Sequence, residues 1–476
     1  MESAALLRRK ADAAVKAGRY AEASDLYARE AAIYRKNGDV NGAKVQEMRS
    51  DRYRSGIQLF AHLKGARIAA AAPKAGALAK WEPAYGCYVG GFIDRDERLG
   101  RAFLDENHQK HYAPSEFSGV VRKKHASVFC YCSYGRPFPA RWVAHLRSYG
   151  VAPHIAWEPN GGLAAVRDDA YLRSFAESAS RARCPIFLRF ASEMNGDWTR
   201  YGGNPRAYKE KWALVKRVME RYAPNVAMVW CVNCIPEKPI ADFYPGDDLV
   251  DWVGVNFYAV PFRDNDVKRP GLHENPADSL KYVYGLYAGR KPIQVCEFGA
   301  SRVSAVDRKD RSEWAASKIR QLYAALPRIY PRVKAINIFD CDNMTYAMPG
   351  RQLNNYSVTD SDRVLMAYRE AVSDDYFLGE VESGASTSTG IVPVPEAGLT
   401  VPRGILRVSA WARCYTDRYS VVYSLDGREV ATSRDPGPRE VKVDLDGPQA
   451  VRTLAATIRD EAGRVACRKE FKLKVT

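Results

Sequence analysis

Eight short apolar runs, separated by amphipathic helical segments between residues 81 and 378, constrain the fold of this chain more than any other feature. Strand-like runs that alternate with helices predict parallel βα units, and eight such units predict an α/β fold, the (β/α)₈ TIM barrel. A doubly wound parallel sheet is the alternative, although no glycine-rich phosphate loop follows the first run. The runs are YGCYVGGF from Tyr85, ASVFCYC from Ala126, HIAW from His154, PIFLRF from Pro185, VAMVWC from Val226, VDWVGV from Val250, PIQVCEF from Pro292 and VKAINIF from Val333.

The segments on either side of residues 81–378 have different patterns. Residues 1–65 have a helical period broken at Gly18 and Gly38, and AVKAGRYAEASDLYAREAAIY resembles a tetratricopeptide helix pair, so we expect an N-terminal α-helical hairpin. Residues 399–476 alternate apolar and polar positions, which predicts an immunoglobulin-like C-terminal β-sandwich. Two linkers are expected between these parts, at residues 66–80 and 379–398.

The composition excludes several classes of protein. No apolar run is long enough to span a membrane, and the charged first residues do not resemble a signal peptide. The formal charge of +16 favours acidic partners, but the basic residues are scattered and no nucleic-acid-binding motif accompanies them. We therefore expect no nucleic-acid partner and no membrane span.

The positions of the ten cysteines give little indication of a metal site, a redox site or disulfides. Cys87, Cys130, Cys132 and Cys296 lie within apolar strand-like runs and are expected to be buried, reduced thiols. Cys231 and Cys234 have the CxxC spacing of a metal or redox site, but no second pair of ligands accompanies them. Only Cys414 and Cys467 are considered for a disulfide.

Two glutamates stand at strand ends, where barrel enzymes carry their active sites. Glu193 follows the fourth run and Glu297 ends the seventh. Carboxyls from these two strands can meet across a bound sugar, and a retaining glycosidase needs such a pair about 5–5.5 Å apart. A salt bridge or a charge at the rim is the alternative for either residue alone.

Aromatic rings at predicted strand ends add to this interpretation, because the apolar faces of sugar rings stack on them. Trp212 and Trp252 fall within helix and strand patterns and are expected in the core. The rings expected near the sugar site are Trp157, Trp198, Tyr201, Trp230, Tyr258 and Phe339.

Six segments of residues 82–350 follow one another in a fixed order: HIAWEP, FLRFASEMNGDWTRYGG, APNVAMVWCVN, FYPGDDLVDWVGVNFY, KPIQVCEFGAS and YPRVKAINIFD. With these motifs, residues 82–350 resemble glycoside hydrolase family 26. The resemblance implies Glu193 as general acid/base and Glu297 as nucleophile, with Tyr258 bonded to the nucleophile and Trp198 as a sugar platform. Arg189 is implied as a buried positioning cation, and a purely structural ion pair is the alternative for it.

One residue departs from the family pattern. Members usually carry His immediately before the acid/base, where this chain has Ser192, whose hydroxyl reaches less far than an imidazole. The departure bears on the contact near the sugar 2-hydroxyl, and so on specificity for mannan. The other polar residues expected to bind substrate are Asn195, Asn233, Asn256 and Asp340.

Together these features predict a retaining β-glycoside hydrolase acting on β-mannan or a related β-glucan or xylan, without a metal or organic cofactor. The alternative is a catalytically silent glycan-binding or cell-surface protein on the same barrel. A polysaccharide substrate implies a secreted or cell-surface protein, although no signal peptide is apparent. The terminal domains are expected to serve any contact with a cell surface or another protein.

Overall fold

The computed structural model describes residues 2–63, 78–381, 390–416, 418–434 and 440–476. The chain divides into two compact units. One contains residues 67–389, and the other combines residues 1–66 with residues 390–476. The predicted linker at 66–80 lies mostly outside the described residues, as does part of the one at 379–398.

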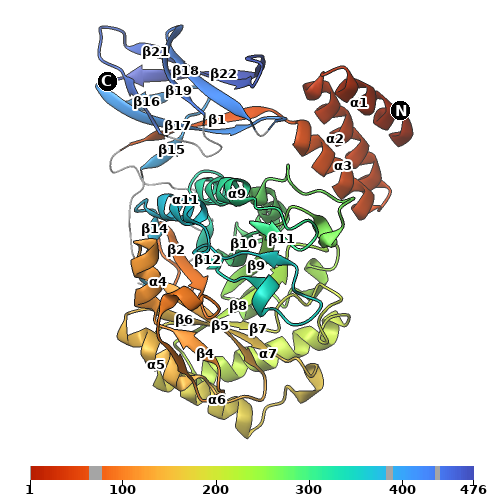
Figure 1. Ribbon diagram of the computed structural model, residues 1–476, viewed down its shortest axis with the longest axis vertical. Coiled ribbons are helices and arrows are strands. Elements are labelled where there is room, and N and C mark those ends of the chain that lie inside the picture. The colour runs from red at the N-terminus through yellow and green to blue at the C-terminus, as the bar shows by residue number, and fades with distance from the viewer. Residues whose placement is uncertain (1, 64–77, 382–389, 417, 435–439) are drawn as a thin grey trace. The chain divides into compact units, whose positions relative to one another are not determined.

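Eight parallel strands of the first unit form a closed barrel, which confirms the predicted fold (Figure 1). The sheet runs in chain order, and the pairing of the last strand with the first closes it. All eight apolar runs of the sequence form these strands. They are β2 (Cys87–Phe92), β5 (Ser127–Ser133), β6 (Ala152–Glu158), β7 (Ile186–Phe190), β8 (Val226–Asn233), β9 (Trp252–Ala259), β10 (Ile293–Ala300) and β12 (Val333–Phe339).

Helices follow most of the barrel strands, and no helix in the described part of the chain could span a membrane. The fifth connection, after β8, departs from the βα pattern because it holds only two 3₁₀ turns, η4 (Ala241–Phe243) and η5 (Asp247–Leu249). The helices are α4 (Pro114–Val121), α5 (Ala140–Ser148), α6 (Ala170–Arg181), α7 (Pro205–Tyr222), α8 (Lys281–Tyr287), α9 (Ser312–Ala325), α10 (Asn343–Tyr346) and α11 (Asp362–Val372). Short strands complete this unit: β3 (Ala102–Leu104), β4 (Lys110–Tyr112), β11 (Val303–Ser304), β13 (Asn354–Asn355) and β14 (Phe377–Leu378).

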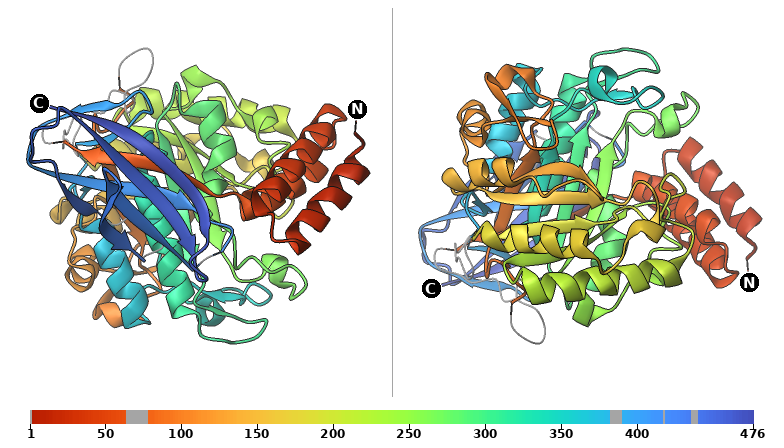
Figure 2. Two further views of the ribbon diagram at one scale, coloured as in Figure 1. Left: turned by 90° about the horizontal axis from the view of Figure 1, so that it is seen from above. Right: turned by 90° about the horizontal axis from the view of Figure 1, so that it is seen from below.

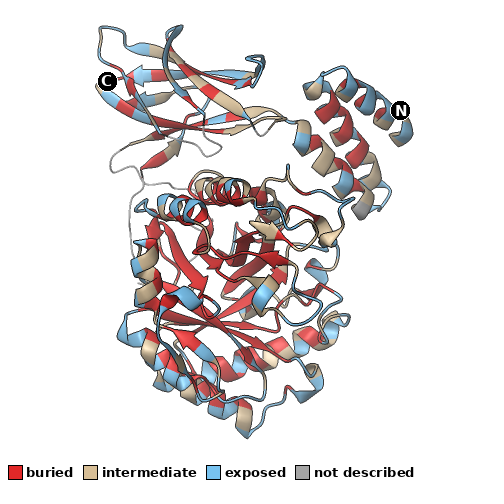
Figure 3. Cartoon of the chain, viewed as in Figure 1, coloured by how far each residue is buried: buried red, intermediate tan, exposed pale blue. Residues whose placement is uncertain are grey.

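The barrel strands are buried along nearly their whole length, whereas the helices expose their outer faces (Figure 3). A strand with both faces covered must be apolar throughout, which is why the sequence shows continuous apolar runs rather than alternation. Aromatic residues gather toward the carboxyl ends of the strands, where Phe92, Phe129, Phe339 and Tyr356 pack together beside Tyr258.

Three helices open the second unit, one more than the predicted hairpin: α1 (Ala4–Lys16), α2 (Tyr20–Lys36) and α3 (Val40–Tyr53). Gly18 and Gly38 follow the first two helices with φ of +69° and +78°. Glycine adopts this left-handed conformation without strain and commonly ends a helix, so both breaks in the sequence pattern are real helix ends. Leu7, Ala11 and Leu26 are among the residues of the small apolar core.

A strand follows these helices, where the sequence predicted a helical segment as far as residue 65. Strand β1 (Gly56–His62) pairs antiparallel with β17 (Ile405–Arg413) along its whole length and with β15 (Ile391–Pro393) at one end. Figure 2 shows it among the strands of the C-terminal segment. The pattern over the seven residues of β1 was too short to identify this strand in the sequence. The strands that it pairs with lie more than 300 residues away, so no neighbouring segment indicated the pairing.

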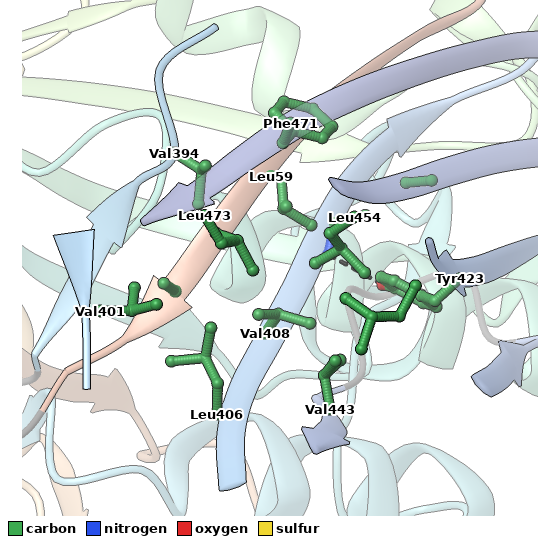
Figure 4. Packing of buried hydrophobic residues seen from close by; sticks show 14 of the residues in the cluster. Leu59, Val394, Val401, Leu406, Val408, Tyr423, Val443, Leu454, Phe471 and Leu473 are labelled. Carbon is green, nitrogen blue, oxygen red and sulfur yellow. Dashed lines mark hydrogen bonds between the residues drawn. The ribbon is translucent and has the colours of Figure 1, made fainter. Parts of the chain in front are cut away.

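Two sheets share one apolar core in this part of the second unit (Figure 4). Leu59 of β1 packs there with Leu406, Val408, Leu454 and Leu473, so residues from both ends of the chain build the core. The first sheet has the order β15-β1-β17-β20, and the second has the order β16-β22-β21-β18-β19. The remaining strands are β16 (Leu399–Val401), β18 (Tyr419–Leu425), β19 (Arg428–Ser433), β20 (Val441–Asp444), β21 (Val451–Asp460) and β22 (Val465–Val475).

Candidate active site

Glu193 and Glu297 lie at the carboxyl ends of barrel strands. Glu193 stands three residues beyond β7, in a turn where both it and Ala191 have left-handed φ, at 58° and 48°. Glu297 lies within β10, where the register shifts relative to both neighbouring strands. Such an irregularity changes the direction of a side chain at the end of a strand.

Glu193 is held by three nitrogen donors. The Asn256 and Asn233 amides donate to its Oε1 at 2.8 and 3.2 Å, and the Trp198 indole N–H donates to its Oε2 at 2.7 Å. The indole is 42% exposed, so the acid stands beside an accessible aromatic surface. Burial raises the pKa of Glu193, and the negative charge of Glu297 raises it further. A carboxyl in this environment is suited to hold a proton and donate it.

Glu297 has a contrasting set of partners. Its Oε1 accepts hydrogen bonds from Arg189 at 2.6 Å and from the Tyr131 hydroxyl at 2.7 Å. Its Oε2 accepts a short hydrogen bond from the Tyr258 hydroxyl. Burial and the Glu297 charge raise the pKa of Tyr258, so this phenol stays neutral and donates. A cation and two hydroxyls stabilise an ionised carboxylate, the form that a nucleophile needs.

Arg189 and Asn256 connect the two glutamates. Arg189 is fully buried and bonds Glu297 through one guanidinium nitrogen and the Asn256 carbonyl through the other, at 3.1 Å. The Asn256 amide nitrogen then donates to Glu193. One continuous network therefore fixes both carboxyls. The network accommodates both predicted roles of Arg189, since the residue orients Glu297 and is also a buried ion pair.

The predicted aromatic residues fall into two groups. Trp198 and Tyr258 lie at the accessible end of the barrel, beside the glutamates. Trp157 and Trp230 are fully buried and pack against Phe175 and Tyr287 respectively. The expectation that these two indoles contact a sugar is therefore wrong. Trp157 lies near the end of β6 and Trp230 lies in the middle of β8, and neighbouring aromatic rings cover both.

Other predicted ligands support the site rather than face it. Asn195 bonds the backbone of Asn233 and Pro236, and so shapes the loop that presents Asn233. Phe339 packs on Phe92 and Tyr258 beneath the carboxyl groups. Asp340 is completely buried and accepts a hydrogen bond from the Val358 amide, so the expectation that it contacts substrate is wrong.

Ser192 and Tyr201 both point to Glu158, the last residue of β6. Ser192 donates to Glu158 through its amide nitrogen at 3.0 Å and through its hydroxyl, and the Tyr201 hydroxyl lies 2.7 Å from the same carboxyl. Both residues are buried, so their predicted role in binding substrate is not supported by their positions. Ser192 faces the protein interior.

Sequence reasoning missed two residues of this site, Tyr131 and Glu158. Tyr131 lies near the end of β5, is 37% exposed, and donates to the candidate nucleophile. Glu158 is the last residue of β6, and Glu297 lies in the second half of β10. The rule that polar residues at strand ends deserve attention would have selected both, had it been applied to the second and third strands.

The cysteines are free thiols in the structure. Those in the barrel strands are buried, as predicted, and burial raises the pKa of Cys87, Cys130 and Cys231. The thiol of Cys231 faces the Asn256 carbonyl oxygen at 3.3 Å. Among the described residues no group of three or more His, Cys, Asp or Glu side chains is arranged to hold a metal.

Comparison with known proteins identifies part of this region. Residues 166–274 match the model of glycosyl hydrolase family 26. The match includes Glu193, Asn256 and Tyr258, and it ends before Glu297. It covers a minority of the chain.

Two curated relatives illustrate the range of similarity. A β-1,3-xylanase from a Vibrio species is 40% identical over 80 residues, which are 16% of this chain and 17% of the xylanase. A mannan endo-1,4-β-mannosidase from a Piromyces species is 27% identical over 117 residues, 24% of this chain and 16% of the mannosidase. The matches thus span about a sixth of the length of either relative.

Solved structures of similar shape include glycosidases. A double mutant of the Cellulomonas fimi endo-β-1,4-mannanase aligns with 82% of this chain and 94% of its own, at 16% identity and a TM-score of 0.44. A family 26 β-mannanase from Bacteroides ovatus aligns with 64% of this chain and 92% of its own, at 12% identity and a TM-score of 0.44.

Proposed function

We propose that this protein is a retaining glycoside hydrolase that cleaves a β-linked polysaccharide, with Glu193 as general acid/base and Glu297 as nucleophile. The observation that carries the proposal is the contrast between the two carboxyls within one network. Glu193 receives only neutral donors and has a raised pKa, whereas Glu297 is paired with Arg189 and two phenols. Such a difference between neighbouring carboxyls assigns one as acid and the other as anion.

The proposed reaction is a double displacement. The Glu297 carboxylate attacks the anomeric carbon while protonated Glu193 donates its proton to the departing glycosidic oxygen. This forms a covalent glycosyl-enzyme and releases the leaving sugar. Ionised Glu193 then removes a proton from a water molecule, which attacks the same carbon, restores Glu297 and reprotonates Glu193. Retention requires the two carboxyls to be about 5–5.5 Å apart.

The proposed substrate class is a β-mannan or a related β-glucan or xylan. Support comes from the family match over residues 166–274 and from relatives described as a β-1,3-xylanase and a mannan endo-1,4-β-mannosidase. Trp198 offers an exposed indole beside Glu193, where a sugar ring can stack while its linkage receives the proton. Because the Ser192 hydroxyl donates its proton to Glu158, it cannot also donate to a sugar 2-hydroxyl.

Substitution of each glutamate, with two kinds of substrate, tests the proposal. Glu297→Ala should abolish turnover of every substrate, because no glycosyl-enzyme can form. Glu193→Ala should lose about 10²- to 10⁴-fold on a polysaccharide, whose leaving sugar needs a proton. With an activated aryl glycoside the same variant should form the covalent intermediate and accumulate it, and added azide should restore turnover. Product release is measured with and without azide.

Binding measurements distinguish the alternative, a silent glycan-binding protein. Wild type and both variants are titrated with the same mannan, mixed-linkage glucan, xylan and acidic glycans used in the activity assays. Equal binding by all three proteins, with no product from any glycan, would favour the silent binder. Wild-type activity in Glu297→Ala would show that the nucleophile is misassigned.

A further inference from the structure

A buried glutamate lies behind the turn that carries the candidate acid/base. Glu158 ends strand β6, and its backbone carbonyl accepts hydrogen bonds from the amides of Tyr134 and Asn160 at 2.9 Å, so its position is well fixed. Its side chain is buried and turns toward the residue that precedes Glu193. The double displacement assigns no role to this carboxyl.

The turn at residues 191–193 needs external support. Ala191 and Glu193 both have left-handed φ, which is a strained conformation for residues other than glycine. Backbone bonds from Ala191 to Trp157 and from Glu193 to Cys231 hold its two ends, at 3.1 and 2.9 Å. The middle residue, Ser192, is held by Glu158 and Tyr201 alone among the contacts described for it.

The Tyr201 hydroxyl lies between two oxygen atoms, and its one proton cannot form a full hydrogen bond to both of them. The Tyr201 hydroxyl lies 2.7 Å from Glu158 Oε2 and 2.7 Å from the Ser192 carbonyl oxygen. A hydroxyl has one proton, and the carbonyl can only accept, so Tyr201 satisfies the carbonyl by donating to it. The contact with Glu158 is then a hydrogen bond only if Glu158 donates to the Tyr201 oxygen, which it can do when protonated.

We propose that Glu158 is a positioning residue that carries a proton and, in this neutral form, holds the turn that presents Glu193. The proposal rests on the proposed function for its catalytic meaning. A proton on Glu158 completes a chain from its carboxyl to the Tyr201 hydroxyl and on to the Ser192 carbonyl. Ser192 closes the ring, since its hydroxyl and amide both donate to Glu158. A neutral carboxyl also keeps another negative charge away from Glu193 and Glu297.

The surroundings favour the neutral form. Burial raises the pKa of Glu158, and this effect outweighs the opposing charge of Arg189 and the hydrogen bonds from Ser192. The other titratable groups whose charges couple to this region are Tyr208 and Glu193. Burial raises the pKa of both Tyr201 and Tyr208, so neither phenol ionises in place of Glu158.

Infrared spectroscopy tests the proton directly and does not depend on activity. A protonated carboxyl has a carbonyl band distinct from that of a carboxylate, and the band of Glu158 is the one absent from Glu158→Gln. We expect the difference spectrum between wild type and this variant at neutral pH to show the band of a protonated acid. A matched control is Glu82→Gln, which removes a buried carboxylate paired with Arg332. A carboxylate difference for Glu158 would overturn the proposal.

Kinetics test the positioning role. Glu158→Ala should lower kcat/KM on a polysaccharide by about 10²-fold, as expected when a reacting group is misplaced. Glycosylation by an activated aryl glycoside should fall far less, because that step does not need the acid. In Glu158→Gln the amide nitrogen can donate to Tyr201 and the amide oxygen can accept from the Ser192 hydroxyl, but the hydrogen bond from the Ser192 amide to Oε2 is lost. This variant should lose less than about tenfold on both substrates, the effect of one neutral hydrogen bond.

The outcomes separate this inference from the proposed function. Any loss of activity in the control Glu82→Gln should be equal on both substrate types, because Glu82 only stabilises the fold. An equal loss on both substrate types in Glu158→Ala would show the same for Glu158 and would overturn its positioning role. A loss in Glu158→Gln as large as that in Glu158→Ala would show that neutral hydrogen bonds do not suffice at this position and would overturn the neutral form. Inactivity of the wild type on every glycan would reject the hydrolase and with it the positioning role, while the infrared result would still decide whether Glu158 holds a proton.

Discussion

Arg189 connects the two candidate catalytic glutamates. It is fully buried, bonds Glu297 directly and reaches Glu193 through Asn256, and its guanidinium also lies 5.4 Å from the Phe129 ring centroid. Replacing it with methionine keeps much of its volume but leaves a buried carboxylate without its cation. Arg189→Met should therefore lower the free energy of unfolding by about 3–5 kcal/mol and reduce activity.

Urea unfolding and polysaccharide hydrolysis measure these two effects. The matched control is Arg206→Met, which removes an arginine from an exposed i,i+4 pair with Glu210 on α7. An exposed pair of this kind contributes between about 0 and 1 kcal/mol, so this control should be nearly silent. Equal stability of the two variants would show that Arg189 is not a required counter-ion.

The pKa of Glu193 provides a second prediction for a single residue. Burial is the largest cause of its rise above 4.5, and the charge of Glu297 adds to it. Glu297→Gln removes that charge, so the pKa of Glu193 should fall but stay raised. The first step needs protonated Glu193, and the wild-type rate of glycosylation should therefore decline as the pH rises through this raised pKa.

Carbon NMR titration of labelled glutamate carboxyls measures this pKa without turnover. Glu193→Gln identifies the resonance by its loss. A rise, or no change, in the pKa of Glu193 in Glu297→Gln would contradict the proposed coupling of the two carboxyls.

Among the elements, strand β1 depends most on partners that are distant in the sequence. Leu59 of this strand is buried in the core formed with residues of the C-terminal segment, whereas its neighbour Gln58 is exposed. Leu59→Ala should destabilise this unit by about 2–5 kcal/mol, the usual effect of a large-to-small change in a core. Gln58→Ala should change its stability by less than about 0.5 kcal/mol.

Hydrogen–deuterium exchange of peptides from β17 and β18 measures this effect within the unit. Faster exchange in Leu59→Ala, but not in Gln58→Ala, is the expected result. Unchanged exchange in Leu59→Ala would indicate that β1 contributes little to the core that it completes.

At the scale of the whole molecule, the division into two units separates chemistry from the rest of the chain. Every side chain of the carboxyl network lies between residues 131 and 297, within the unit of residues 67–389. A compact unit with its own core can fold alone. A fragment of residues 67–389 should therefore keep hydrolysis of a soluble polysaccharide, with a kcat close to that of the full chain.

Circular dichroism establishes that the fragment is folded before its activity is compared. A folded fragment that binds substrate but has lost turnover would show that residues outside this unit take part in the chemistry.

The barrel and the strand-end positions of its glutamates could be predicted from local sequence patterns. A strand covered on both faces must be apolar throughout, so each barrel strand appears in the sequence as a continuous apolar run. The residue that follows such a run therefore lies at a strand end, where barrel enzymes carry their active sites. Gly18 and Gly38 ended helices for an equally local reason, since glycine adopts positive φ without strain. Patterns of this kind need no knowledge of distant residues.

Which strand-end residues are accessible, and which segments pair, became known from the folded structure and could not be predicted from local patterns. Trp157 and Trp198 look alike in the sequence, but Phe175 covers one indole and solvent reaches the other. The Ser192 side chain faces the interior, where Glu158 of strand β6 accepts a hydrogen bond from its hydroxyl. Strand β1 joined a sheet more than 300 residues away. Burial and long-range pairing depend on which distant residues pack beside a given residue. A local sequence pattern contains no information about those distant residues.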